Sequence, residues 1–184
     1  HAVLYAAMYS LTASFIFRRF ASLKDALQQI LARGPPQQFL LMFGHSEWIY
    51  IIGLASYWIS RESEEPHWAE MGGDVAKGAV GGWSKTSRWN FEHKLFLLEA
   101  EEHFCNRNYE QAKNCYEKAI DSAATKKFTK DEALACELAG YFYLEMDEKV
   151  TALDYLVKAH ERYEMWGATG KATKLHEEIM TKLS

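Results

Sequence analysis

Apolar side chains recur every three or four residues along nearly the whole chain, which is the spacing of amphipathic helices. Alternation with a period of two is absent and β-branched residues dominate no segment, so we expect no strands. Short stretches rich in Gly, Pro, Asn, Asp and Ser interrupt the pattern, as they do between helices. The pattern therefore predicts an all-α protein with nine helices, at residues 2–19, 23–33, 38–60, 66–80, 89–106, 109–124, 130–146, 149–165 and 169–183.

A second pattern has a 40-residue period, as the stretches "LLEAEEHFCNRNYEQAKNCYEKAI" and "ELAGYFYLEMDEKVTALDYLVKAH" show when they are aligned without a gap. Small residues recur where paired helices must cross at short range, and a large apolar residue fills the space beside them. The packing set predicted to be buried consists of Ala100, Ala112, Tyr116 and Ala119 in the first copy, and Gly140, Ala152, Leu156 and Ala159 in the second.

This packing set resembles the signature of the tetratricopeptide repeat, and Tyr109 matches the aromatic residue that begins its second helix. Lys149 departs from it, both copies lack the terminal proline, and the family's period is shorter than the one seen here. We place the extra residues in a longer loop at "AATKKFTKD". The resemblance implies a right-handed stack of antiparallel helix hairpins. It divides one continuous domain into divergent hairpins (1–88), two repeats (89–168) and a capping helix (169–184).

A narrower resemblance concerns the words "EALACELAG", "FYLE" and "YEMWGATGKATKL". They are similar to the helical-repeat region of large multidomain signalling proteins that combine kinase-like, ATPase and histidine-kinase parts. This resemblance implies that the chain is an excised piece of a larger protein, in agreement with a sequence that begins with His1 and not with methionine.

The tetratricopeptide resemblance also implies a groove lined by the first helix of each hairpin. Its groove positions correspond to residues 94, 97, 101, 104 and 105, and to residues 134, 137, 141, 144 and 145. We take six of these as candidate partner-binding residues: Lys94, Leu97, Glu101, Glu137, Tyr141 and Glu145. Members that clamp a carboxylate use Lys, Asn and Arg there. Carboxylates and apolar residues instead favour a neutral or basic protein partner.

Composition narrows the environment and the partners. The net charge of -4 without a basic block makes nucleic acid an unexpected partner. Three cysteines without paired short spacing favour a reducing intracellular compartment, namely the cytoplasm, over a disulfide framework. The apolar run at 39–60 is long enough to cross a bilayer. His45, Ser46 and Glu47 interrupt it, so a buried helix is favoured over a membrane-spanning one.

No motif supplies catalytic chemistry. The seven histidines lack metal-ligand spacing, so we expect no metal and no cofactor. Cys105, Cys115 and Cys136 fall within apolar helices and are interpreted as buried thiols. "MGGDVAKGAVGGWSK" lacks the phosphate-loop spacing and is interpreted as a helix that ends at Gly81–Gly82. Trp166 is expected to fix the terminal helix, whose apolar stripe is Leu175, Ile179 and Leu183.

The sequence thus predicts a non-enzymatic interaction or scaffold module that binds a peptide or helix on a concave face. Two alternatives stay open. The chain is an intramolecular helical spacer of a larger signalling protein, or a non-catalytic subunit of a larger complex that is associated with a membrane.

Overall fold

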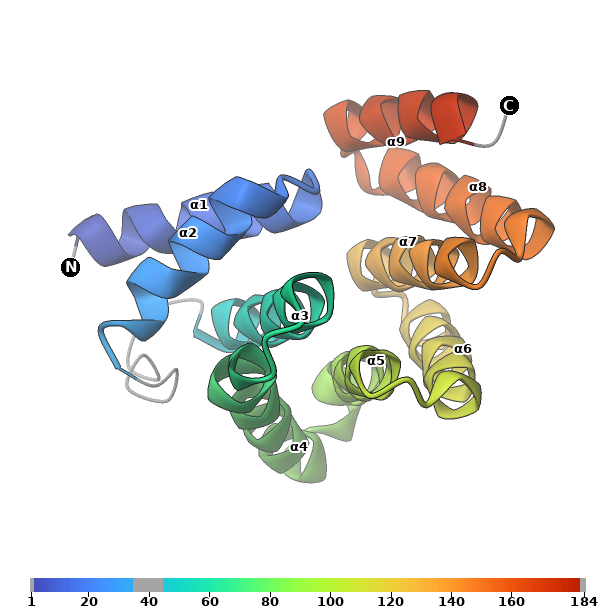
Figure 1. The fold of residues 1–184 in the computed structure, drawn as a ribbon. Coiled ribbons are helices and arrows are strands. Elements are labelled where there is room, and N and C mark those ends of the chain that lie inside the picture. Colours follow the sequence, from blue (N-terminus) through green and yellow to red (C-terminus); the bar gives the residue numbers. More distant parts are fainter. Residues whose placement is uncertain (1, 35–44, 183–184) are drawn as a thin grey trace. The chain divides into compact units, whose positions relative to one another are not determined.

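The computed structural model describes residues 2–34 and 45–182, and this part of the chain is all-helical, without a strand (Figure 1). The expected fold class is therefore confirmed at the level of an all-α protein. The helices are α1 (Ala2–Ile16), α2 (Phe20–Leu31), α3 (His45–Ser63), α4 (Asp74–Thr86), α5 (Arg88–Cys105), α6 (Tyr109–Thr125), α7 (Thr129–Glu145), α8 (Lys149–Trp166) and α9 (Thr169–Lys182), with a π-helical turn at Ala69–Gly73.

The chain divides into two compact units. Unit 1 comprises residues 1–91 and 101–108, and unit 2 comprises residues 92–100 and 109–184. Helix α5 therefore contributes its two ends to unit 1 and its middle to unit 2. The domain limits expected from the sequence, after residues 88 and 168, stay a prediction.

Unit 1 has α3 in its core. The helix is buried from Trp48 to Ser60, and it packs on α1, α2, α4 and the π-helical turn. The π-helical turn comes close because it carries glycine, and a Cβ atom added to Gly73 would lie 2.6 Å from the ring of Tyr57. The Tyr57 hydroxyl donates a hydrogen bond to Asp74 (2.9 Å), which fixes the start of α4. The expectation of a buried helix for the apolar run is confirmed for residues 48–60, and residues 45–47 are helical but only partly buried. Residues 39–44 lie outside the described ranges.

None of the helices in the described ranges combines the length and the apolar character that crossing a membrane requires.

Helix α4 is longer than the sequence predicted. It does not end at Gly81–Gly82 but continues to Thr86. Its last turn carries Trp83, whose ring lies 5.4 Å from that of Phe91 and 5.7 Å from that of His45. These ring contacts stabilise the helix beyond the glycines, whose low helix propensity costs only about 1 kcal/mol each.

Unit 2 is built around α7, which is buried continuously from Asp131 to Tyr143. It packs against α6 on one side and α8 on the other, and α9 packs on α8 (Figure 1). The packing set is buried as predicted, since its eight members are at most 2% exposed or classed as buried. A Cβ atom on Gly140 would lie 2.6 Å from Leu156 and 3.3 Å from the carbonyl oxygen of Ala152. The small residues therefore mark a close helix crossing, as the repeated pattern requires.

The 40-residue period also governs the backbone of the connections. Arg107 and Asp147 have φ near 59°, and Lys127 and Gly167 have φ of 63° and 87°. After each of these residues an N–H group donates to the carbonyl five residues earlier, which is the Schellman arrangement at a helix C-terminus. The four bonds join Asn108 to His103, Glu148 to Tyr143, Phe128 to Ala123 and Ala168 to Tyr163, at 2.8–2.9 Å.

The extra residues of the long period lie in the helices. The loop expected at "AATKKFTKD" is wrong, since α6 continues to Thr125 and residues 126–128 alone connect it to α7. Ala123 is 1% exposed, so the added turn of α6 is held by packing.

The predicted role of Trp166 stays a prediction; this side chain is 49% exposed. Helix α9 packs through Ala172, Leu175 and Ile179, which are at most 8% exposed. The third residue of the predicted stripe, Leu183, lies outside the described ranges.

Candidate functional site

The six candidate partner-binding residues lie on α5 and α7, but most of them are not at the surface. Glu145 is exposed, whereas the other five are at most 9% exposed. Glu137 and Tyr141 contact the later helices α8 and α9, and Glu101 pairs with Arg61 of the earlier helix α3. Their binding role stays a prediction, and the contacts that bury them explain how the helices are positioned.

Glu137 is the centre of a buried polar cluster that joins three helices. Its carboxylate accepts a hydrogen bond from the Tyr163 hydroxyl of α8 (2.7 Å) and pairs with the ammonium group of Lys171 of α9 (2.6 Å). The Glu137 and Lys171 side chains are only 2% and 4% exposed. A buried charge is tolerated when it is paired and hydrogen-bonded. The pair therefore fixes the position of α9 on the unit.

Tyr141, one turn later on α7, makes a second connection to α9. Its hydroxyl donates to the carboxylate of Glu178 at 2.6 Å. A bond from a neutral hydroxyl to a carboxylate is stronger than one between neutral groups. Two of the predicted groove positions thus contact α9 and, in this chain, serve helix packing.

Lys94 belongs to a second buried cluster, around Asp131 at the start of α7. The Asp131 carboxylate lies 2.9 Å from Nε2 of His93 and 3.5 Å from Nζ of Lys94, both on α5. The His93 ring stacks on Phe128, with ring centres 4.5 Å apart. Burial raises the pKa of Asp131, but the hydrogen bond from His93 and the charges of Lys94 and Lys130 outweigh it and lower that pKa to about 2.

The lowered pKa of Asp131 predicts a pH dependence of stability. The contribution of this carboxylate is complete above its ordinary pKa of 3.8, and it disappears as the pH falls from about 4 through 2. We expect a loss of the order of 2 kcal/mol over that window, a shift of about two pKa units being worth that much. Urea unfolding of the wild type and of Asp131→Asn at pH 5 and pH 2.5 measures it. Equal pH dependence in both proteins would contradict this assignment.

Glu101 and Leu97 lie on the same helix, α5. The Glu101 carboxylate is 3% exposed and pairs with Arg61 of α3 at 3.2 Å, within unit 1. The Arg61 guanidinium also lies 3.9 Å from the ring centre of Phe104. Leu97 is 1% exposed. Both residues therefore have structural partners in the chain.

A repeated polar contact was missed by the sequence reasoning. Glu92 accepts hydrogen bonds from Ser122 (3.3 Å) and Lys126 (2.6 Å), and one period later Glu132 accepts one from Arg162 (2.6 Å). Glu92 and Glu132 occupy the same place in the two repeats, as do Ser122 and Arg162. The identical glutamates one period apart were the signal that could have revealed this pair of contacts.

The described residues offer little for nucleophilic or metal chemistry. Cys115 and Cys136 are buried and Cys105 is partly buried, and all three are free thiols. Burial raises the pKa of Cys136 to about 12, so this thiol stays protonated near neutral pH. Across residues 2–34 and 45–182, His, Cys, Asp and Glu form no group of three that could hold a metal ion. That the chain is not an enzyme and uses no cofactor stays a prediction.

Comparison with known proteins gives a partial match. No family model matches the chain, and no solved structure matches it. A segment of 58 residues, 32% of the chain, is 36% identical to hybrid signal transduction histidine kinase G of Dictyostelium discoideum. The segment spans only 2% of the length of that kinase. The match fits a helical region within a larger kinase.

Proposed function

We propose that the chain is a protein-interaction module of the tetratricopeptide type, a right-handed stack of antiparallel helix hairpins without catalytic activity. It binds a peptide or helix of a partner along the face of unit 2 formed by residues 92–100 of α5, by α7 and by α9. The observation that carries the proposal is the 40-residue period. In unit 2, the buried packing residues, the backbone at the helix ends and the polar contacts all repeat with this period. Repeated hairpins of this kind present extended surfaces to protein partners.

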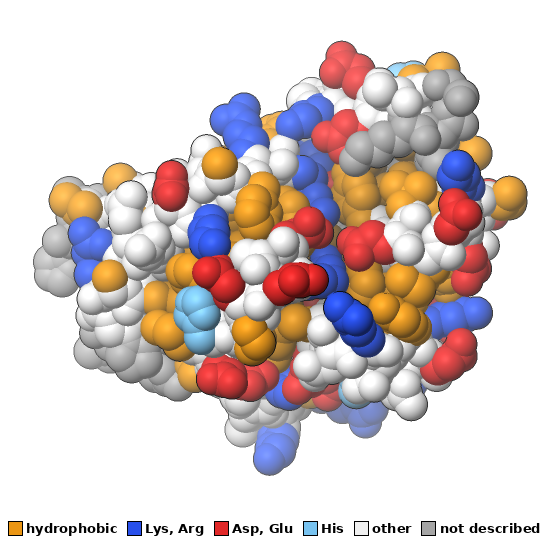
Figure 2. Space-filling view, in the orientation of Figure 1, with side chains coloured by type: hydrophobic (Ala, Val, Ile, Leu, Met, Phe, Trp, Pro, Cys, Tyr) orange, Lys and Arg blue, Asp and Glu red, His pale blue; other side chains and the backbone are white. Residues whose placement is uncertain are grey.

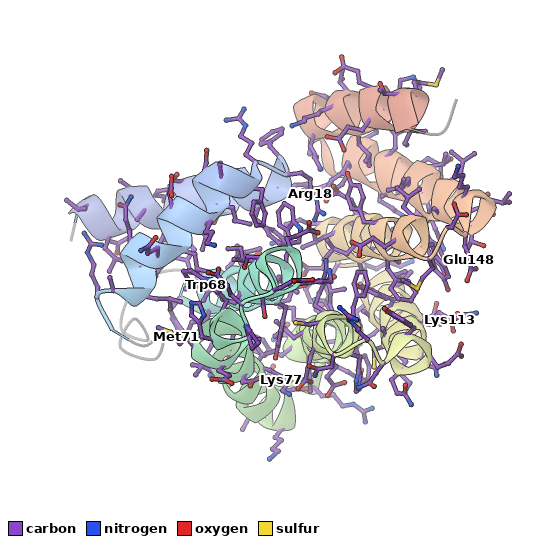
Figure 3. The ribbon with its side chains drawn as sticks, viewed as in Figure 1. Arg18, Trp68, Met71, Lys77, Lys113 and Glu148 are labelled. Carbon is purple, nitrogen blue, oxygen red and sulfur yellow. The ribbon has the colours of Figure 1, made fainter. Side chains whose placement is uncertain are left out.

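The proposed binding face rests on which side chains are exposed to solvent as well as on the groove positions of the repeat. Glu145, at the end of α7, is the predicted groove residue that is exposed, and the adjoining connection to α8 contains the exposed side chains of Asp147 and Glu148. Figure 3 labels Glu148. Three carboxylates within four residues favour a neutral or basic partner and repel an acidic one. Lys94, Leu97, Glu101, Glu137 and Tyr141 contribute indirectly, because their buried contacts hold the helices that form the face.

The proposal is tested with peptides selected from a displayed library on the 184-residue chain, followed by fluorescence anisotropy. We expect neutral or basic peptides to be selected, and Glu145→Lys combined with Glu148→Lys to weaken their binding at least tenfold. Both residues are exposed, so their charges contribute little to stability and the variant should fold.

A control is Asp121→Lys, which reverses one charge at an exposed position of α6 near its connection to the start of α7, at the opposite end of α7 from Glu145. It should leave the affinity within about twofold, since exposed charges far apart interact weakly at physiological ionic strength. Equal weakening by this control, or unchanged binding by the double variant with its circular dichroism intact, would count against the assigned face. Reversal of Glu101 or Glu137 is unsuitable as a test, because both carboxylates are buried in ion pairs.

The alternative function is an intramolecular helical region of a larger signalling protein. The partial match to a histidine kinase supports it. The two functions differ in where the partner lies. An intramolecular region would bind segments of its own full-length protein and would select no peptide from a random library.

A further inference from the structure

Helix α8 carries an apolar stripe on its outer side. Val150, Leu153 and Val157 follow one another at spacings of three and four residues, so they share one side of the helix. They are 79%, 37% and 42% exposed, respectively. The residues that α8 buries in unit 2 lie on another side and include Ala152, Leu156 and Ala159. We name the three exposed residues the α8 stripe.

The equivalent side of α6 is charged. The residues one period before the α8 stripe are Glu110, Lys113 and Glu117, and all three are exposed; Figure 3 labels Lys113. Both helices bury residues at equivalent positions, and both are followed by a residue in the left-handed conformation. Charged residues are thus compatible with this position in the fold, and folding does not require the α8 stripe to be apolar. Figure 2 shows hydrophobic side chains that reach the surface among charged ones over α7 and α8.

The shape of the stripe fits a helix as its occupant. Val150, Leu153 and Val157 form a narrow apolar row along α8, and the apolar row of one helix packs against that of another.

The charges around the stripe indicate the polar residues of such a helix. Glu161 and Glu164 follow the stripe, four and seven residues after Val157, and both are exposed. Glu164 lies 3.8 Å from His160, and at the other end Lys149 lies 4.0 Å from Asp147. Two carboxylates at the C-terminal end of α8 attract lysine or arginine on an incoming helix.

We propose that the α8 stripe docks an amphipathic helix of a partner protein, which carries its own apolar stripe and basic residues that face Glu161 and Glu164. Apolar contact supplies the affinity and the carboxylates orient the helix. This surface lies on α8, whereas the face under the proposed function lies on α5, α7 and α9. The two proposals therefore stand or fall separately.

The test replaces the α8 stripe by the residues that the chain itself carries on α6, in the variant V150E/L153K/V157E. The probes are three synthetic 18-residue helical peptides with one shared leucine stripe and with lysine, glutamine or glutamate on the polar side. Fluorescence anisotropy should show the lysine peptide binding the wild type most tightly, and the variant should bind it at least tenfold more weakly with an unchanged melting temperature. The variant E161Q/E164Q should reduce the preference for lysine over glutamine.

Three results would overturn the proposal. The first is unchanged affinity in the folded triple variant, and the second is equal binding of the three peptides to the wild type. The third is a wild-type dimer, seen by sedimentation velocity, that the triple variant abolishes, since the occupant would then be a second copy of the chain. If the triple variant does not fold, V150E alone, at the most exposed position of the stripe, is measured in the same way.

Discussion

Replacement of Lys171 by alanine should lower the free energy of unfolding by about 3–5 kcal/mol, the usual cost of breaking a buried ion pair. The variant leaves the Glu137 carboxylate, 2% exposed, without its counter-ion between α7, α8 and α9. The hydrogen bond from Tyr163 is retained but does not neutralise the charge. Urea unfolding followed by circular dichroism measures the difference.

Two further variants separate the ion pair from other effects of the substitution. Lys174→Ala removes another lysine from α9, one whose ammonium lies 3.9 Å from Glu178 and is 37% exposed, and should cost less than about 1 kcal/mol. The double variant E137Q/K171M removes both charges and keeps a partner for Tyr163, so it should recover most of the lost stability. Equal losses for Lys171→Ala and Lys174→Ala would show that the buried pair does not hold α9.

Replacement of Ala152 by leucine is expected to destabilise the chain by about 1–3 kcal/mol through overpacking. Ala152 is 0% exposed, and its carbonyl oxygen lies near the position that a Cβ atom of Gly140 would take. Ala112→Leu, at the equivalent place in the first repeat, should have a similar effect, since Ala112 is also 0% exposed. Thermal unfolding followed by circular dichroism reports both changes.

The control for this prediction is a substitution that enlarges a small residue where the added atoms meet no neighbouring side chain. A Cβ atom on Gly78, within α4, would meet nothing within 4 Å. Gly78→Ala should therefore stabilise the chain by about 0.5–1 kcal/mol through helix propensity. Unchanged melting temperatures for Ala112→Leu and Ala152→Leu would contradict the assigned crossings.

Much of the fold could be read from the sequence because it depends on side-chain size and periodicity. The helix pattern is set by apolar spacing, and the crossing of α7 and α8 by small residues at Gly140 and Ala152. The helix ends were harder to place, because charged residues adopt the left-handed conformation that glycine usually supplies. Arg107, Lys127 and Asp147 do so, whereas only Gly167 gave a conventional signal among the repeat connections.

The candidate site was less predictable for a different physical reason. Glu101 and Glu137 were expected at the surface because they match groove positions of the resembled repeat, and charged side chains are usually exposed. Their partners, Arg61 and Lys171, lie on other helices, far away in the sequence, and approach only in the folded chain. Spacing along one helix cannot reveal such a pair. Glu145, at the end of α7, is exposed as expected.

Hydrogen–deuterium exchange of the 184-residue chain, with and without a peptide selected on it, tests the central claim most directly. We predict slower exchange on binding at the end of α7 and in its connection to α8, residues 141–148, and along the adjoining helices α5 and α9. Exchange that is unchanged in these segments while the selected peptide is bound would contradict an interaction module that uses this face.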